Sequence, residues 1–110
     1  MSFDSGLTVL IADDSDSDRL LLQRIVQSQG HRTIVAKHGL EAIEAFKFTP
    51  PDIVLLDALM PVMDGFDTAR YIKAHMGNSF IPIIFLTSLN DAESLARCLE
   101  AGGDDFLTRP

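Results

Sequence analysis

Carboxylates that could act together follow two separate apolar runs of the sequence. Asp13 and Asp14 come just after residues 7–11, and Asp57 comes directly after residues 53–56. If both runs are parallel strands of one sheet, their carboxyl ends meet at the edge where open α/β sheets bind ligands. Carboxylates gathered there repel one another unless a cation neutralises them. Mg²⁺ is the expected cation, because the cluster offers carboxylate oxygens with no His or Cys ligand nearby.

A hydroxyl and a cation follow two other apolar runs. Thr87 comes after residues 81–86, and Arg109 follows residues 105–107 closely. With Mg²⁺ and Arg109 present, a carboxylate that gains a phosphoryl group is compensated to within about one charge. Asp57 is the expected acceptor, because it stands alone at its strand end, whereas adjacent carboxylates suit a metal. Thr87 could donate its hydroxyl to a phosphoryl oxygen and so couple the chemistry to the following loop.

These residues belong to four motifs that together resemble the receiver domain of bacterial two-component response regulators, over essentially the whole chain. The motifs are VLIADD (9–14), DIVLLD (52–57) followed by MPVMDG (60–65), FLTS (85–88) and GGDDFLTRP (102–110). The resemblance implies that Asp57 accepts phosphate from a histidine kinase or phosphotransfer protein. The Mg²⁺ ligands that it implies are Asp13, Asp14, Asp57 and the backbone carbonyl of Leu59. It also implies that Thr87 and Phe106 rearrange together as a switch.

One position departs from the family pattern, because Arg109 stands where the family usually has Lys. Arg keeps the positive charge, but its planar fork does not place that charge where a Lys ammonium would. We expect phosphorylation to survive this change, while its coupling to Thr87 and Phe106 stays open. An interaction-only receiver, which folds alike but is not phosphorylated, is therefore the alternative function.

The segments that must position these residues alternate between short apolar runs and longer runs of helical period, which predicts βα units and a parallel sheet. Strands are expected at residues 7–11, 33–36, 53–56, 81–86 and 105–107, with 33–36 nearer an edge. Helices are expected at about residues 15–29, 39–49, 66–76 and 95–101. We predict one receiver domain over residues 1–110, with a doubly wound, five-stranded parallel sheet in the flavodoxin-like order 2-1-3-4-5.

A helix is missing from this pattern. An open parallel sheet needs helices on both faces, and the sequence stops at Pro110, just after the fifth expected strand. We therefore expect a final helix, and a possible output domain, in a continuation beyond Pro110. Without that helix an apolar strip beside the first helix would lie uncovered, which predicts self-association, such as a homodimer, or lowered stability.

Composition narrows the classes of partner. A formal net charge of -7, with nine scattered basic residues, argues against direct contact with nucleic acid. No apolar run is long enough to span a bilayer, and residues 1–6 lack a secretory layout, which predicts a cytoplasmic protein without membrane contact. The lone Cys98 lies among apolar residues and is expected to be a small buried hydrophobe.

Other functions that use similar residues fit the sequence less well. Asp14, Asp16 and Asp18 imitate a calcium loop, but Arg19 and Ile25 stand where that loop requires Gly and Glu. Asp16 and Asp18 are better explained as favourable charges at a helix start. A nucleotide- or flavin-binding protein would have a glycine-rich loop after the first strand. A phosphohydrolase with an Asp nucleophile would want a second acid at position 59, so we expect a regulatory phosphoacceptor and not an enzyme.

Overall fold

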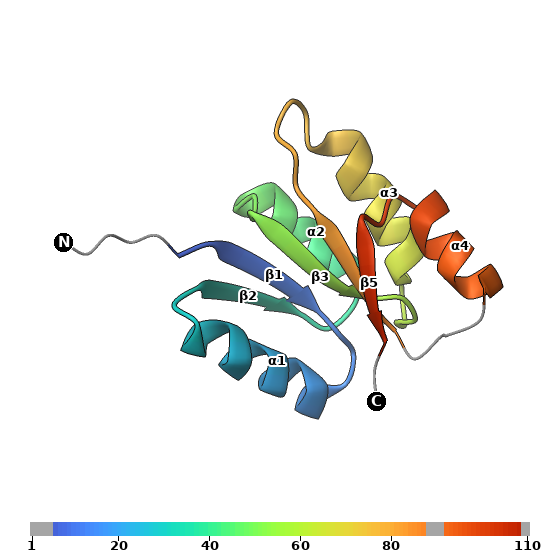
Figure 1. The fold of residues 1–110 in the computed structure, drawn as a ribbon. Coiled ribbons are helices and arrows are strands. Elements are labelled where there is room, and N and C mark those ends of the chain that lie inside the picture. Colours follow the sequence, from blue (N-terminus) through green and yellow to red (C-terminus); the bar gives the residue numbers. More distant parts are fainter. Residues whose placement is uncertain (1–5, 88–91, 109–110) are drawn as a thin grey trace.

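The computed structural model describes residues 6–87 and 92–108, and a parallel sheet forms its centre (Figure 1). The strands are β1 (Thr8–Ala12), β2 (Arg32–Ala36), β3 (Ile53–Asp57), β4 (Ile83–Thr87) and β5 (Asp105–Thr108). The five strands are parallel and lie in the order β2-β1-β3-β4-β5, which confirms the predicted fold class and strand order. β2 lies at an edge of the sheet, as predicted.

Four helices connect the strands: α1 (Asp16–Ser28), α2 (Gly39–Phe48), α3 (Gly65–His75) and α4 (Ala92–Glu100). The first of them begins where the sequence predicts, because the Ser15 side chain accepts a hydrogen bond from the Asp18 backbone N–H. The Asp64 side chain caps α3 in the same way by accepting from the Asp67 N–H, at 2.9 Å. No described helix has the length and apolar character needed to cross a membrane.

The main core lies between the sheet and the helices α2, α3 and α4. The buried strand side chains there include Leu10, Leu56 and Phe85, and they pack in one cluster with Ile72 of α3 and Cys98 of α4. Alternate residues of each strand face this cluster, as the period of two in a strand requires. Cys98 is fully buried, as expected, and its burial raises the pKa of the thiol.

The opposite face of the sheet carries α1, which lies across the sheet from α2 and α3 (Figure 1). No residue of α1 is fully buried. Its apolar side chains Leu20, Leu21 and Ile25 are 47%, 58% and 51% exposed. Apolar surface is thus exposed on α1 itself, and the uncovered strip expected beside this helix stays a prediction.

Candidate functional site

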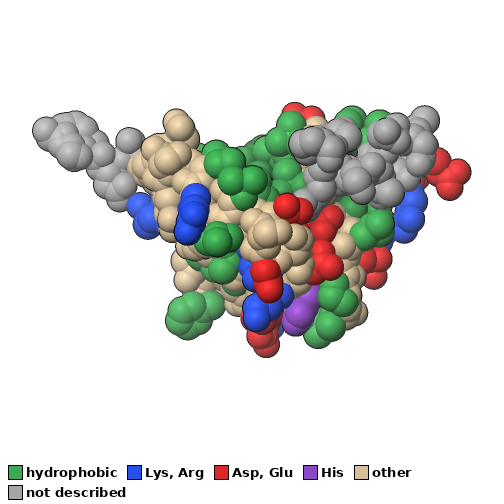
Figure 2. All heavy atoms as spheres, turned by 90° about the horizontal axis from the view of Figure 1, so that it is seen from below, with side chains coloured by type: hydrophobic (Ala, Val, Ile, Leu, Met, Phe, Trp, Pro, Cys, Tyr) green, Lys and Arg blue, Asp and Glu red, His purple; other side chains and the backbone are tan. Residues whose placement is uncertain are grey.

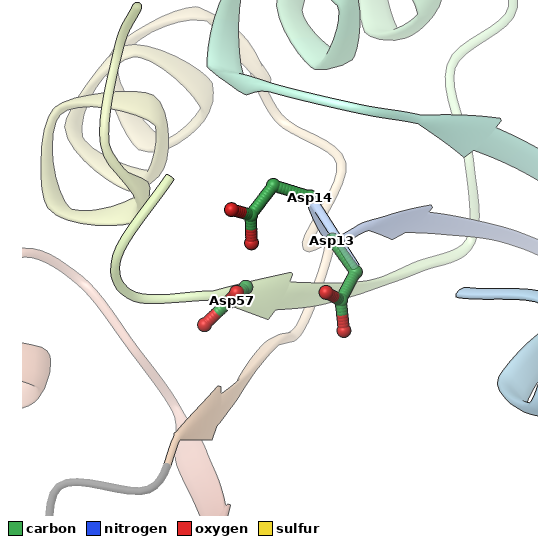
Figure 3. A group of neighbouring side chains, drawn as sticks. All are labelled: Asp13, Asp14 and Asp57. Carbon is green, nitrogen blue, oxygen red and sulfur yellow. The ribbon is translucent and has the colours of Figure 1, made fainter. Parts of the chain in front are cut away.

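The carboxylates of Asp13, Asp14 and Asp57 meet at the carboxyl ends of two neighbouring strands. Asp13 and Asp14 follow β1, Asp57 ends β3, and the two strands are paired in parallel. One carboxylate oxygen from each of the three residues lies within 4.8 Å of the other two. Figure 3 shows the three side chains around one space, so the structure brings together the residues that the sequence singled out.

The three carboxylates differ in their surroundings. Asp13 is fully buried, Asp57 is partly buried and Asp14 is exposed, so the cluster opens to solvent on the side of Asp14. The Asp13 Oδ1 atom accepts a hydrogen bond from the Ser15 N–H at 2.9 Å, and the Asp57 Oδ1 atom accepts a longer one from the Leu59 N–H at 3.4 Å. Acidic side chains also gather on this face of the molecule (Figure 2).

The donor set fits a hard divalent cation. Two unit negative charges at about 5 Å repel by roughly 3 kcal/mol at an effective dielectric constant of 20. A cation removes this cost, and the three groups in the cluster are all carboxylates, with no His or Cys among them. Mg²⁺ prefers a few such oxygens completed by water molecules and phosphate oxygens. Asp13, Asp14 and Asp57 could therefore hold Mg²⁺, with water or phosphate oxygens as its remaining ligands.

The loop after β3 is folded back against Asp57. The Gly65 N–H donates to the Ala58 carbonyl at 2.9 Å, which closes the loop into the start of α3. A Cβ atom at Gly65 would lie 2.1 Å from the Asp57 carbonyl oxygen, so only glycine allows this close approach. Leu59, whose carbonyl is the expected further metal ligand, lies in this loop and contacts Asp57 through its N–H.

A strained turn lies in the same loop and was not foreseen from the sequence. Val62 has a φ of 71°, and the Met63 N–H donates to the Pro61 carbonyl at 2.8 Å. A hydrogen bond between residues two apart around a central residue of this φ defines a γ-turn of the rare, strained form. Valine gives no sequence signal for it, because β-branched residues avoid positive φ.

Arg19 also contacts a residue of the cluster, and the sequence did not point to this contact. Its Nη1 atom donates to the Asp13 backbone carbonyl at 2.8 Å, and its Nη2 atom pairs with Asp16 Oδ1. The hydrogen bond and charge of Arg19 lower the pKa of the Asp16 carboxyl. The spacing of three between Asp16 and Arg19 signals their ion pair. The contact with Asp13 has no such signal in the sequence.

The other expected site residues are only partly described. Thr87 ends β4, next to the strand that carries Asp57, but its side chain lies outside the described part of the structure. Arg109 lies outside the described residues altogether. Phe106 is partly buried in β5, pairs in register with Phe85 and packs against the core cluster.

The sheet order and the acidic cluster at its edge define a class of protein. The chain belongs to the response regulator receiver domain family, whose model matches residues 9–110. It is therefore a two-component signalling domain, as the sequence motifs indicated.

Individual relatives agree with this assignment. The chain is 37% identical to the probable transcriptional regulator ycf27 of Guillardia theta, over 93% of this chain and 39% of that protein. It is 34% identical to the chemotaxis protein CheY of Halobacterium salinarum, over 93% of this chain and 83% of that protein. The solved structure of Vibrio cholerae CheY4 superposes with a TM-score of 0.90 at 28% identity, covering 96% of this chain and 88% of that one. The chain thus spans well under half of ycf27 and most of CheY.

Proposed function

We propose that this chain is a phosphorylation-dependent switch in which Asp57 accepts a phosphoryl group from a histidine kinase or phosphotransfer protein. The observation that carries the proposal is the meeting of Asp13, Asp14 and Asp57 within 4.8 Å at the edge of the sheet. Asp57 is the acceptor, because it ends a central strand and is partly buried and partly accessible. Asp13 and Asp14 hold the cation, with the Leu59 carbonyl as a further ligand.

The reaction at Asp57 is a phosphoryl transfer from the donor to its carboxylate. A carboxylate oxygen of Asp57 forms a bond to phosphorus, the bond between phosphorus and the donor breaks, and the donor leaves with the bonding electron pair. When held by these residues, Mg²⁺ would supply positive charge that offsets the charge of the phosphoryl oxygens. The chain assists its own phosphorylation and dephosphorylation in this way and catalyses no other reaction.

The response to phosphorylation is assigned to Thr87, Phe106 and Arg109. Thr87 ends β4 at the same edge of the sheet as Asp57, and Phe106 lies on β5 next to β4. A hydroxyl drawn towards the phosphoryl group would change the packing around Phe106, and Arg109 would contribute its positive charge. The face formed by α4 and β5 would then change partners.

The setting of the domain is also a proposal. We propose that residues 1–110 belong to one receiver domain. MtrA of Mycolicibacterium paratuberculosis, 34% identical over 44% of its length, is a DNA-binding response regulator. For this chain we propose signalling in the cytoplasm, with no direct contact to nucleic acid or membrane.

The direct test is a mass measurement. The protein is incubated with MgCl₂ and acetyl phosphate, and we expect the mass to increase by one phosphoryl group. Asp57→Asn should abolish the gain, because an amide does not form the acyl phosphate. Asp67→Asn is the matched control, since Asp67 is an exposed carboxylate of α3 that pairs with Arg70, and it should be phosphorylated like the wild type.

A second candidate function is the interaction-only receiver, which Arg109 in place of the usual Lys favours. It shares the fold and differs in the result of the same experiment. No mass gain in the wild type, or an undiminished gain in Asp57→Asn, would reject phosphorylation at Asp57 and leave this candidate.

A further inference from the structure

Arg19 is held unusually tightly for an arginine on the surface of a helix. Its side chain is only 12% exposed. The guanidinium donates through Nη1 to the Asp13 carbonyl at 2.8 Å and contacts Asp16 through Nη2. The planar fork of Arg can hold two acceptors at once in a fixed arrangement. Arg19 therefore ties the end of β1 to the first turn of α1.

The carbonyl that Arg19 holds belongs to the peptide bond between Asp13 and Asp14. This peptide unit is planar, so fixing its carbonyl fixes the direction in which the chain enters Asp14. The backbone N–H and the carboxylate of Asp13 are held as well. The N–H donates to the Ala36 carbonyl at 3.1 Å, and the Oδ1 atom accepts from the Ser15 N–H at 2.9 Å. Arg19 completes this set of contacts.

Asp14 depends on this arrangement more than Asp13 does. The Asp13 carboxylate is buried and is held by the Ser15 N–H. The Asp14 carboxylate is exposed, and within residues 6–87 and 92–108 no protein donor holds it. The backbone alone aims it at the space that it shares with Asp13 and Asp57.

We propose that Arg19 is a positioning residue of the metal site, which aims the Asp14 carboxylate by holding the Asp13 carbonyl. The inference deepens the proposed function and rests on it for the identity of the cation as Mg²⁺. Groups that orient the ligands of a metal without touching the metal commonly change its affinity by 10- to 100-fold when they are replaced.

The charge of Arg19 and its positioning role affect the Mg²⁺ affinity in opposite directions. The direction in which the affinity changes in a variant therefore tests the inference. A positive guanidinium beside the cluster repels a cation, so loss of its charge alone would strengthen Mg²⁺ binding. Loss of positioning would weaken the binding instead. Arg19→Lys separates the two effects, because it keeps the charge and removes the fork.

Mg²⁺ affinity is measured by isothermal titration calorimetry with MgCl₂ as the probe. We expect Arg19→Lys to weaken the affinity by about tenfold. Arg19→Gln should weaken it by less, because loss of the repelling charge offsets part of the lost positioning. Asp16→Asn removes the ion pair but leaves the contact of Arg19 with Asp13, and it should bind Mg²⁺ within about twofold of the wild type. Arg70→Gln is the matched control, because Arg70 forms an ion pair of the same spacing with Asp67 on α3. It should bind Mg²⁺ like the wild type.

The Mg²⁺ dependence of phosphorylation by acetyl phosphate gives a second measurement. In Arg19→Lys the Mg²⁺ concentration for half-maximal rate should rise about tenfold, while the rate at saturating Mg²⁺ stays at the wild-type value. A purely structural role would reduce the amount of active protein, and hence the maximal rate, without moving the midpoint.

The results that overturn the positioning role are distinct from those that overturn the proposed function. Unchanged or tighter Mg²⁺ binding in both Arg19 variants, beside a wild type that binds Mg²⁺ and is phosphorylated, rejects the role of Arg19 alone. A wild type that neither binds Mg²⁺ nor gains a phosphoryl group rejects the proposed function and this inference with it.

Discussion

Val62 is the residue whose backbone departs most from what its side chain prefers. Its φ of 71° is the only positive value at a non-glycine position among the described residues, and it lies in the loop that follows Asp57. The side chain is 71% exposed, so it gains little from packing in exchange for the strain. Strain of this kind costs of order 1–3 kcal/mol and is common near functional sites.

Glycine at this position should stabilise the protein. Val62→Gly removes the steric conflict, which outweighs the roughly 0.4–1 kcal/mol by which glycine favours the unfolded chain. We expect a gain of about 1 kcal/mol, which corresponds to a melting temperature about 5 °C higher in a domain of this size. Thermal and urea unfolding of the variant measure both quantities.

Leu59→Gly is the control for this substitution. Leu59 is exposed in the same loop and has no positive φ, so glycine there should lower the stability. If Val62→Gly destabilises the protein as much as Leu59→Gly does, the turn is not strained.

Helix α1 combines a contact to the acidic cluster with exposed apolar side chains. Its first turn carries Arg19 beside the acidic cluster, while Leu20, Leu21 and Ile25 farther along it are about half exposed. Leu21 and Ile25 are four residues apart and therefore lie on the same face of the helix. Such a surface favours association with another apolar surface.

The 110-residue chain should therefore self-associate through α1. Static light scattering is expected to show an apparent mass that rises with protein concentration, because association buries the exposed side chains of α1. Replacing Leu21 and Ile25 together by Gln should shift this association to concentrations at least about tenfold higher, since each buried aliphatic side chain contributes roughly 1.5–3 kcal/mol.

Phe48→Gln is the control for the α1 variant. Phe48 is a 91% exposed apolar residue at the end of α2, so replacing it removes comparable apolar surface from another helix. It should leave the association unchanged. A wild type that stays monomeric over the whole concentration range would contradict the proposed role of α1.

At the scale of the whole molecule, the acidic cluster links metal binding to stability. The three carboxylates lie at the ends of β1 and β3, where they repel one another. The chain as a whole already carries a net charge of -7. A cation that binds the folded chain and not the unfolded chain stabilises the fold by mass action. Removal of Mg²⁺ should therefore be visible in the stability of the protein.

Mg²⁺ at ten times its dissociation constant should stabilise the wild type by about 1.4 kcal/mol. Thermal melting with and without MgCl₂ measures the effect, and EDTA should reverse it. Asp13→Asn should lose most of the stabilisation, because it removes the buried ligand of the cluster. NaCl of matched ionic strength should not stabilise the wild type in the way that MgCl₂ does. An equal rise of the melting temperature in Asp13→Asn would show that Mg²⁺ acts elsewhere.

Much of the fold could be predicted from the sequence, because its signals are local. Apolar runs of strand length, the capping residue Ser15 and the helix ends at Gly30 and Gly77 lie next to the elements that they specify. The strand order followed from the alternation of strands and helices together with the preference for right-handed crossovers. The observed bounds of the elements differ from the predicted ones by only a few residues, as at α2, which ends at Phe48.

The sequence by itself determined which carboxylates meet, because residues that end parallel strands share one edge of the sheet. Asp13, Asp14 and Asp57 could be named in this way before any distance was known. Only the tertiary structure decided how they are held. The contact of Arg19 with a backbone carbonyl and the positive φ of Val62 depend on how a turn and a loop pack against the sheet. Neither depends on residue type or spacing alone, so no sequence pattern could have indicated them.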